Sequence, residues 1–447
     1  MKLIQTLKNI WKIEELRNRL LTTLGFIVVY RFCSYVVLPG INTQALTALH
    51  SQTREGIMSL LDMFSGGAFS NASIVALGIM PYISASIVMQ LLGMAVPFFQ
   101  KLQREGESGR TKMNQYTRYM TVGILILQAP AYLANLSAQM GNAGSALPPG
   151  FWFKFSSVLI LAAGSMFTLW IGERITDKGI GNGVSMIILI GIIARLPRAL
   201  TQEFISRYST TSAGGLVMLL AELLLLLAVT IFSILLVQGT RKVPVQYAKR
   251  VVGNKQYGGA RQYIPLKVNA AGVMPIIFAQ AIMFIPLAFI GYSNTAAASG
   301  FGSAFTNING PWYNFVFAIM IVAFTYFYTA ITINPQQMAE EMKRNNGFIP
   351  GIKPGKRTAE YLDAIMSKIT LPGSIFLAFI AIMPAFAKLF GINAQFSQFF
   401  GGTSLLIIVG VVLDTLQQIE SHLLMRHYDG LLKSGRIKGR TGSIAAY

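Results

Sequence analysis

The stretch that decides the fold class is residues 216–237, which read LVMLLAELLLLLAVTIFSILLV and contain one charged side chain, Glu222. An α-helix of ~20 predominantly apolar residues is long enough to cross the ~30 Å hydrocarbon core of a bilayer. The run therefore predicts a membrane-spanning helix over 213–237, and it is the clearest such helix in the chain.

The rest of the chain repeats this pattern. Of its 447 residues, 53% are hydrophobic and only 12% are charged, whereas a soluble domain is about 25% charged. We predict an all-α polytopic membrane protein with about ten spans, at 19–38, 74–96, 119–137, 153–172, 180–197, 213–237, 271–291, 312–333, 369–390 and 403–425. Residues 56–73 are apolar but too short and too rich in glycine to cross alone. They predict a half-inserted helix that protein or a water-filled cavity must cover.

The distribution of basic residues predicts the orientation. The chain has 37 Lys and Arg against 17 Asp and Glu, and thirty of the 37 lie at the two ends and in the loops after the second, fourth, sixth and eighth spans. Cytoplasmic loops of membrane proteins carry such an excess of Lys and Arg. We therefore expect a cytoplasmic N-terminal segment 1–18, basic cytoplasmic loops 238–270 and 334–368, and a cytoplasmic tail 426–447.

Ten spans divide into two halves of five, 19–197 and 213–425. An odd number of spans in each half would let the second half enter the membrane from the opposite side, as in inverted repeats, although the halves show no convincing sequence similarity. The single Cys33 excludes an intrachain disulfide. With three His and no paired carboxylates at helical spacing in the spans, the sequence predicts neither an enzyme nor a bound metal or cofactor.

Five separated motifs carry a resemblance to a known family. They are 76–92 (ALGIMPYISASIVMQLL), 175–185 (ITDKGIGNGVS), 265–273 (PLKVNAAGV), 348–355 (FIPGIKPG) and 402–407 (GTSLLI). The sequences of these motifs and their order along the chain resemble the SecY/Sec61α family of protein translocation channels, of the bacterial SecY type. The resemblance extends over nearly the whole chain. The resemblance implies the central pore-forming subunit of a Sec translocon in the bacterial cytoplasmic (inner) membrane.

The resemblance also implies roles for individual residues. In that family an hourglass pore narrows at a ring of aliphatic side chains, and the matching positions are Ile79, Ile83, Ile188, Ile277 and Ile407. Taken singly, each of these isoleucines is explained by ordinary core packing, and the pore role comes from the resemblance. Residues 56–73 match the plug that blocks the pore, and its candidate residues are Leu60, Leu61, Phe64, Ser65, Gly66, Gly67 and Asn71.

Two further groups of residues match the lateral gate and the docking loops of the family. The second and seventh spans would form a gate toward lipid, with hydrogen-bonding residues Gln90, Asn182 and Asn269 near its seam. The basic loops match surfaces that dock the ribosome and the SecA ATPase, with candidate residues Arg241, Lys242, Lys249, Arg250, Lys255, Lys353, Lys356 and Arg357. Other implied partners are the small membrane subunits SecE and SecG, signal-bearing polypeptide substrates and the lipid bilayer.

A second class of function stays open at this point. A secondary transporter for a small solute would keep ionisable residues at the membrane midplane for coupling. The candidates for that role are few, namely Glu222 in the sixth span and Asp414 in the tenth. Topology control and contact with anionic lipid also explain part of the basic charge without any docked partner.

Overall fold

The structure, a computed structural model, describes residues 11, 13–41, 62–142, 148, 150–209, 215–247, 250–252, 255–257, 261–280, 282–283 and 310–433. The helices of the first half are α2 (Glu14–Cys33), α5 (Met80–Ala95), α6 (Pro97–Arg104), α7 (Glu107–Asn142), α8 (Phe151–Lys178), α9 (Gly183–Ile193) and α10 (Leu196–Ser209). Those of the second half are α11 (Gly215–Gln238), α14 (Pro311–Thr332), α15 (Pro335–Arg344), α16 (Lys356–Leu389), α17 (Ala394–Ser397) and α18 (Gly402–Lys433). A 3-10 turn, η2 (Gln398–Phe400), joins α17 to α18.

The all-α membrane architecture is confirmed, while the count of ten spans stays a prediction. Among the described residues, seven helices are long and apolar enough to cross a membrane, or eight if the bent pair α5–α6 forms one span. The expected seventh span, 271–291, lies only partly within the described residues. The first, expected at 19–38, corresponds to α2, which begins earlier at Glu14 and ends at Cys33.

Several boundaries differ from the sequence-based expectation for local reasons. The span expected from residue 74 becomes helical only at Met80, because Pro81 lies in the first turn, where its missing N–H costs no hydrogen bond. Residues before it run in successive turns, and Gly78 has a φ of +53°. The fifth span continues past residue 197, because α10 follows α9 after a short turn and the two together provide a span from Gly183 to Tyr208.

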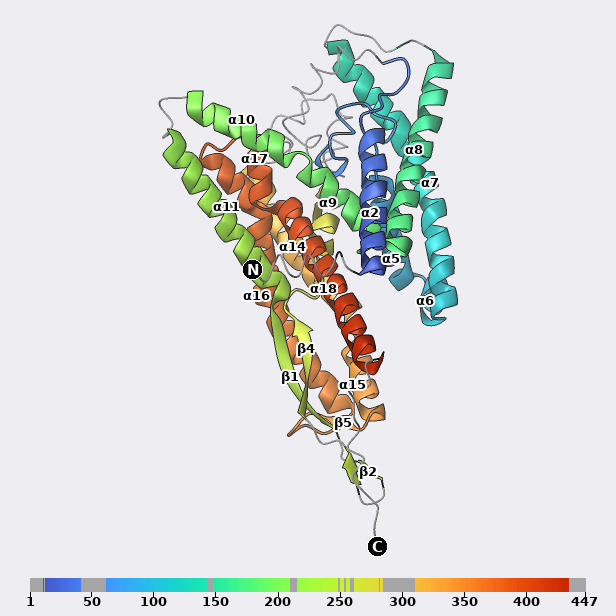
Figure 1. Cartoon of the computed structure of the whole chain (residues 1–447), viewed down its shortest axis with the longest axis vertical. Helices are drawn as coiled ribbons and strands as arrows, with labels where there is room; N and C mark the ends of the chain where they lie inside the picture. The colour runs from blue at the N-terminus through green and yellow to red at the C-terminus, as the bar shows by residue number, and fades with distance from the viewer. Residues whose placement is uncertain are drawn as a thin grey trace.

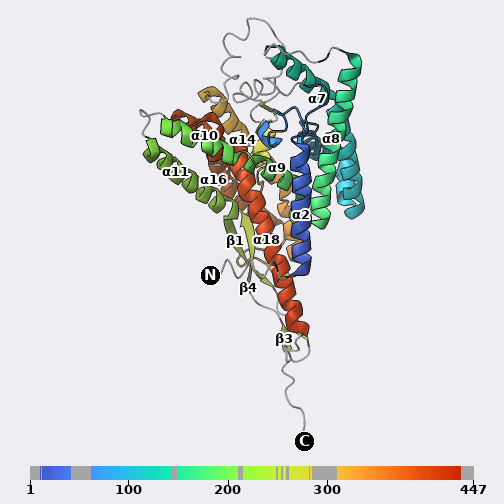
Figure 2. The same ribbon diagram turned by 45° about the horizontal axis from the view of Figure 1, so that its top comes forward.

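The two loops predicted to be basic are folded. In the first, β1 (Thr240–Tyr247) pairs antiparallel with β4 (Arg261–Lys267), with Val243 opposite Ile264. A short strand β5 (Gly347–Phe348) from the second loop adds to the other edge of β1, and β2 (Arg250–Val252) pairs with β3 (Lys255–Tyr257). Val243 and Val245 point into a small core with Leu362 of α16, so the strands alternate between buried and exposed positions. The β1–β4 hairpin lies at the opposite end of the molecule from α10 and α17 (Figures 1 and 2).

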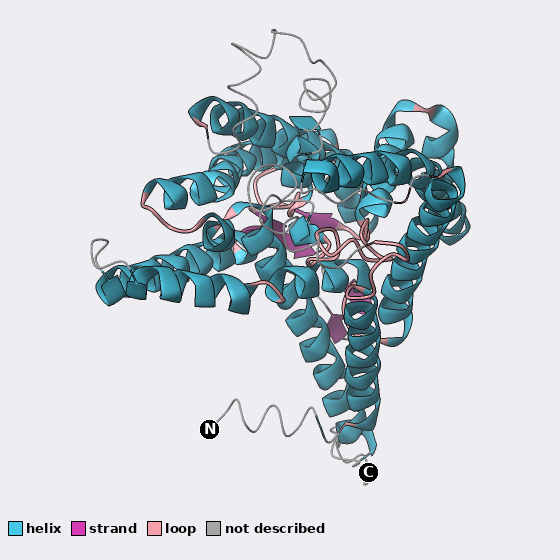
Figure 3. Cartoon of the chain, turned by 90° about the horizontal axis from the view of Figure 1, so that it is seen from above, coloured by secondary structure: helices cyan, strands magenta, loops and turns pink. Residues whose placement is uncertain are grey.

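The helices surround a centre that is not itself helical. Seen along the long axis, turns and loops lie in the middle with helices around them (Figure 3). A central apolar cluster draws side chains from α2, α9 and α18 and from the turns before α5. Separate clusters pack α7 against α8 and α11, α14 and α16 against α18. The site described next lies in the central cluster.

Candidate functional site: the pore waist and its plug segment

Three of the isoleucines that match the pore ring are buried together. Ile79, at the start of α5, is 2% exposed, Ile188 of α9 is 6% exposed, and Ile407 of α18 is 5% exposed. All three belong to the central cluster, and Ile83 packs against it from one turn further along α5. We call these four residues the waist. The two halves of the chain thus meet at branched apolar side chains.

Ile277, the fifth ring candidate, is placed differently. It is half-buried and is not among the residues that pack in the central cluster, whereas Val273, four residues earlier, does pack against it. The motif at 265–273 ends at Val273, so the match to the family left the register beyond it unsupported by sequence. The place of Ile277 in the pore ring stays a prediction.

The described part of the expected plug packs on the waist. Met63, Phe64 and Ala68 belong to the same cluster as the waist residues. The Ser404 hydroxyl donates to Met63 Sδ at 3.2 Å, which ties this segment to the start of α18. We call residues 62–73 the plug segment. Leu60 and Leu61 lie outside the described residues. Asp62–Phe64 are helical and residues 65–73 form turns and one bridge, so the half-inserted helix is not seen in the described part.

Two glycines allow the plug segment to approach α9 closely. Gly66 has a φ of +65° and Gly67 a φ of +92°, a region that L-residues with a side chain rarely adopt. A Cβ on Gly66 would lie 2.7 Å from the Cα of Gly191, which is closer than real Cβ contacts allow. The two backbones therefore touch at Gly66 and Gly191, and a side chain at Gly66 would separate them.

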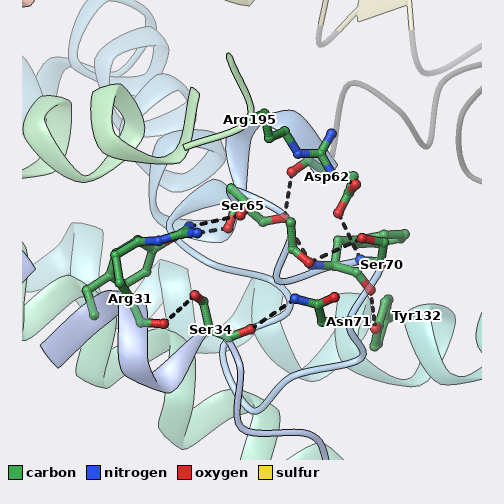
Figure 4. A network of polar contacts seen from close by, with 12 residues as sticks. Arg31, Ser34, Asp62, Ser65, Ser70, Asn71, Tyr132 and Arg195 are labelled. Carbon is green, nitrogen blue, oxygen red and sulfur yellow. Dashed lines mark hydrogen bonds and ion pairs between the residues drawn. The ribbon is translucent and has the colours of Figure 1, made fainter. Parts of the chain in front are cut away.

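Hydrogen bonds from two flanking helices hold the backbone of the plug segment (Figure 4). The Tyr30 hydroxyl donates to Ser65 O at 3.2 Å, and Arg31 Nη1 donates to Gly66 O at 2.9 Å, both from α2. From α7, the Tyr132 hydroxyl donates to Phe69 O at 2.9 Å. Ser65 O and Phe69 O also accept from backbone N–H groups within the segment, so Tyr30 and Tyr132 add a second donor to each of them. For Gly66 O, Arg31 supplies a donor to a carbonyl in a turn, where no ladder partner is available.

One ion pair fixes the start of the plug segment. Asp62, 4% exposed, pairs with Arg195 from the turn between α9 and α10, and its Oδ1 accepts from the backbone N–H of Ser70 at 2.8 Å (Figure 4). A cavity of 210 Å³ adjoins this pair, lined by Arg31, Asp62, Arg195 and Arg198 among others. None of these four residues was predicted from the sequence to have a role. The available signal was that the three arginines lie outside the cytoplasmic segments that hold most of the basic charge.

A second buried ionic cluster lies between α10 and α11. Arg207 Nε is 2.9 Å from Glu203 Oε1, and its Nη2 is 2.5 Å from Glu222 Oε1. Arg207 Nη2 also donates to Gly391 O at 3.0 Å, and the N–H of Asn393 donates to Glu203 Oε2 at 3.0 Å. The cluster joins the last helix of the first half to the second half. Glu222 is thus engaged in a structural ion pair.

The three gate candidates occupy different environments. Asn182 caps α9, because its Oδ1 accepts from the N–H groups of Val184 at 3.1 Å and Ser185 at 3.3 Å. Gln90 is half-buried on α5, and Asn269, 8% exposed, has a buried Oδ1 with no hydrogen-bond partner among the described residues. No hydrogen bond joins the three side chains to one another in the described part of the chain.

The docking candidates lie on the folded basic loops. Arg241 and Lys242 on β1 and Lys353, Lys356 and Arg357 around the start of α16 are exposed. Arg250 and Lys255 are on the paired strands β2 and β3, whereas Lys249 lies outside the described residues. Within the described ranges, no group of three or more His, Cys, Asp or Glu is arranged to hold a metal ion.

Comparison with solved structures gives the same architecture. A structure described as "The structure of a protein conducting channel" matches with a TM-score of 0.58 at 17% identity, over 95% of each chain. A yeast Ssh1 complex bound to the 80S ribosome matches with a TM-score of 0.58 at 14% identity, over 88% of each chain. At these identities the likeness shows the fold.

Comparison with known sequences identifies the family. A curated relative from Streptomyces scabiei, named "Protein translocase subunit SecY", is 42% identical and covers 95% of this chain and 98% of its own length. The protein of the same name from Escherichia coli K12 is 40% identical over 95% of this chain and 96% of its own. The SecY family model matches residues 73–416. Because the family model and full-length relatives agree over nearly the whole sequence, this chain belongs to the SecY family.

Proposed function

We propose that this chain is the central pore-forming subunit of a Sec translocon. It passes unfolded, signal-bearing polypeptides across the bacterial cytoplasmic membrane and releases membrane segments sideways through a lateral gate. The observation that carries the proposal is the waist, where Ile79, Ile188 and Ile407 from both halves are buried together under the plug segment. The named relatives are translocase subunits, and they do not support a solute transporter.

The chemistry of the waist suits this task. A ring of branched apolar side chains dewets a narrow pore and so opposes the passage of ions. Such side chains also make no hydrogen bonds that would hold a passing chain in place. A polar ring at Ile79 and Ile407 would bind water and the substrate backbone, which would both leak ions and slow transport.

A crosslinking experiment tests the pore path. A photoreactive residue replaces Ile79, Ile407 or, as a control, Leu224, which is 60% exposed on α11. A signal-bearing substrate stalled in transit should crosslink to the probes at Ile79 and Ile407 and not to the probe at Leu224. Crosslinks that form at Leu224 and are missing at both waist positions would refute a path through the bundle.

The lateral gate is proposed at the seam between the second and seventh spans, with Gln90, Asn182 and Asn269 near it. Hydrogen bonds between membrane helices are worth only ~0.6–2 kcal/mol each, so an inserting apolar segment can compete with gate closure. Asn182→Leu also removes the N-cap of α9, whereas Asn182→Ser keeps a capping oxygen. We expect Asn182→Leu to alter the export of substrates with weak signal sequences, and Asn182→Ser to alter it less. Equal export by both variants and the parent would refute a role for Asn182 in the lateral gate.

The exposed basic residues of β1 and α16 are proposed to dock cytoplasmic partners, namely the ribosome and the SecA ATPase. Phosphate contacts by Lys and Arg give salt-dependent affinity. Lys353 stands where the family usually has Arg, and Lys lacks the bidentate fork of Arg. We expect Lys353→Arg to strengthen ribosome binding at fixed salt and Arg357→Gln to weaken it, as measured by co-sedimentation. The small subunits SecE and SecG complete the proposed assembly, with both termini of this chain in the cytoplasm.

A further inference from the structure

Three of the basic residues that break the charge pattern of the chain meet at one place. Most Lys and Arg lie in the segments expected to be cytoplasmic, and seven do not. Three of those seven, Arg31, Arg195 and Arg198, line the 210 Å³ cavity beside the plug segment. Arg31 lies near the end of α2, Arg195 lies in the turn between α9 and α10, and Arg198 lies in the first turn of α10. Residues far apart in the sequence thus bring positive charge to a single cavity.

The positive charge of this cavity is not balanced. Among the described residues that line it, Asp62 is the single carboxylate, against three guanidinium groups. Asp62 pairs with Arg195, while Arg31 donates to two neutral oxygens, Gly66 O at 2.9 Å and the Tyr35 hydroxyl at 3.3 Å. Arg198 is exposed at the cavity. Neutral polar side chains complete the wall, among them Gln202 and Gln395. Such a cavity favours an anion.

The geometry points to a carboxylate as the anion that fits. Guanidinium groups bind carboxylates through two parallel hydrogen bonds, and Arg195 already holds one carboxylate of this chain. Resting on the proposed channel function, we propose that the cavity binds Asp or Glu side chains of the passing polypeptide, which replace Asp62 on Arg195 and thereby release the plug segment.

The release follows from the burial of Asp62. Its side chain is 5% exposed, and a buried carboxylate that loses its cationic partner is strongly unfavourable until it reaches water. Asp62 Oδ1 also accepts from the Ser70 backbone N–H, so movement of Asp62 pulls on both ends of the plug segment. The contacts that remain are the hydrogen bond from the charged Arg31 guanidinium to Gly66 O, the hydrogen bonds from Tyr30 and Tyr132, and apolar packing. A competing carboxylate therefore acts on the ion pair that holds the start of the segment.

The plug segment supplies its own reporter position. Ser70 is 1% exposed, so a cysteine there is shielded while the segment is seated. The experiment uses Ser70→Cys in a Cys33→Ser background, which removes the native thiol. The full-length chain is reconstituted in vesicles, and the rate at which the introduced cysteine reacts with a maleimide is measured. The probes are a short peptide with three glutamates and the same peptide with three glutamines.

We expect the glutamate peptide to raise the labelling rate about tenfold, the factor that a shift of ~1.4 kcal/mol in the seated–released equilibrium produces. The glutamine peptide should leave the rate unchanged. Asp62→Asn should label fast without any peptide and respond to neither. Arg198→Gln should reduce the response to the glutamate peptide, measured as the ratio of its labelling rates with and without the peptide. Arg344→Gln, an exposed arginine at the end of α15, controls for the loss of one positive charge.

The outcomes separate this inference from the proposed function. Transport of a signal-bearing substrate is measured in the same vesicles. If transport occurs but both peptides give the same labelling rate, the carboxylate site is refuted and the channel function stands. An undiminished response in Arg198→Gln would likewise refute the site, because the extra positive charge would then play no part. If no substrate is transported and the glutamate peptide still speeds labelling, the site stands and the channel function fails.

Discussion

Two buried ionic clusters lie in the same part of the molecule and are built in opposite ways. At Asp62–Arg195, one carboxylate lies near several arginines, a cavity adjoins the pair, and Asp62 is in a single helical turn that leads into the turns of residues 65–73. At Glu203–Arg207–Glu222, one arginine faces two carboxylates, all three side chains are 8% exposed or less, and both glutamates lie on helices. The first cluster holds the segment whose release we propose, whereas the second joins the helices α10 and α11.

The comparison shows that the surroundings of an ion pair decide its role. Removing one partner from a fully buried pair leaves a charge that cannot reach water, whereas a pair beside a cavity can be rehydrated. The second cluster also binds backbone groups near α17 through Gly391 O and the Asn393 N–H, so it fixes three elements at once. The predictions below test this order of strength.

The largest effect is expected from Arg207→Met. This variant leaves Glu203 and Glu222 buried without a counter-charge, which costs ~3–5 kcal/mol when one partner of a buried pair is removed. We expect a clear drop in the unfolding midpoint of the purified chain in detergent. Combining Arg207→Met with Glu203→Gln and Glu222→Gln should recover part of the loss. A combined variant that is less stable than Arg207→Met would contradict the ionic origin of the effect.

A smaller effect is expected from Arg195→Gln. The Arg195 side chain is 27% exposed, so water can replace part of what Asp62 loses. Leaving a buried group without its hydrogen-bonding partner costs ~1–3 kcal/mol. We expect unfolding to shift less than in Arg207→Met, but ion leakage through vesicles to rise, because the plug segment is held less firmly. Arg195→Lys keeps the charge without the fork and should fall between the parent and Arg195→Gln.

Substitutions at Gly66 and Gly67 test how the plug segment is held without changing any charge. Gly66→Ala combines a positive φ, which costs ~1–2 kcal/mol for a residue with a Cβ, with a clash against Gly191. Gly67→Ala has the strained φ but no atom closer than 3.9 Å, so it isolates the backbone cost. We expect more ion leakage from Gly66→Ala than from Gly67→Ala. Equal leakage would mean that close contact with α9 does not seat the segment.

The smallest effect is expected from Arg118→Gln. Arg118 of α7 lies 2.7 Å from Glu173 of α8, but the two side chains are 49% and 33% exposed. Exposed pairs contribute ~0–1 kcal/mol. We expect an unfolding midpoint within error of the parent at physiological salt. A shift comparable to that of Arg207→Met would show that exposure does not rank these pairs.

Much of the fold could be predicted from sequence because hydropathy is a local property. The run at 216–237 and the apolar stretches that became α8, α14 and α18 are long enough to predict a helix on composition alone. Boundaries were less certain, since α7 and α16 extend into segments that their charges assigned to loops. Charge marks where a helix leaves the bilayer, but it does not end the helix. The β1–β4 hairpin was missed for a similar reason, because its basic residues predicted a cytoplasmic location and not a conformation.

The candidate site likewise has residues that could be predicted from the sequence and residues that could not. The match to the family selected Ile79, Ile188 and Ile407, which are buried together, and Ile277, which is half-buried and outside that cluster. The register of Ile277 could not be fixed from sequence, because nearly every residue of that span is apolar. The plug contacts of Tyr30, Arg31 and Tyr132 were not expected, because their partners are backbone carbonyls that leave no trace in the sequence.

The sequence by itself determined the membrane class and the family, because these depend on composition and on long motifs that match over nearly the whole chain. Its basic residues give a prediction of orientation. Only the tertiary structure decided which charges meet. Asp62 and Arg195 lie in different elements, as do Glu222 and Arg207, and nothing local links them. Coulomb energy depends on distance and on the dielectric around the pair, and both are set when the helices pack.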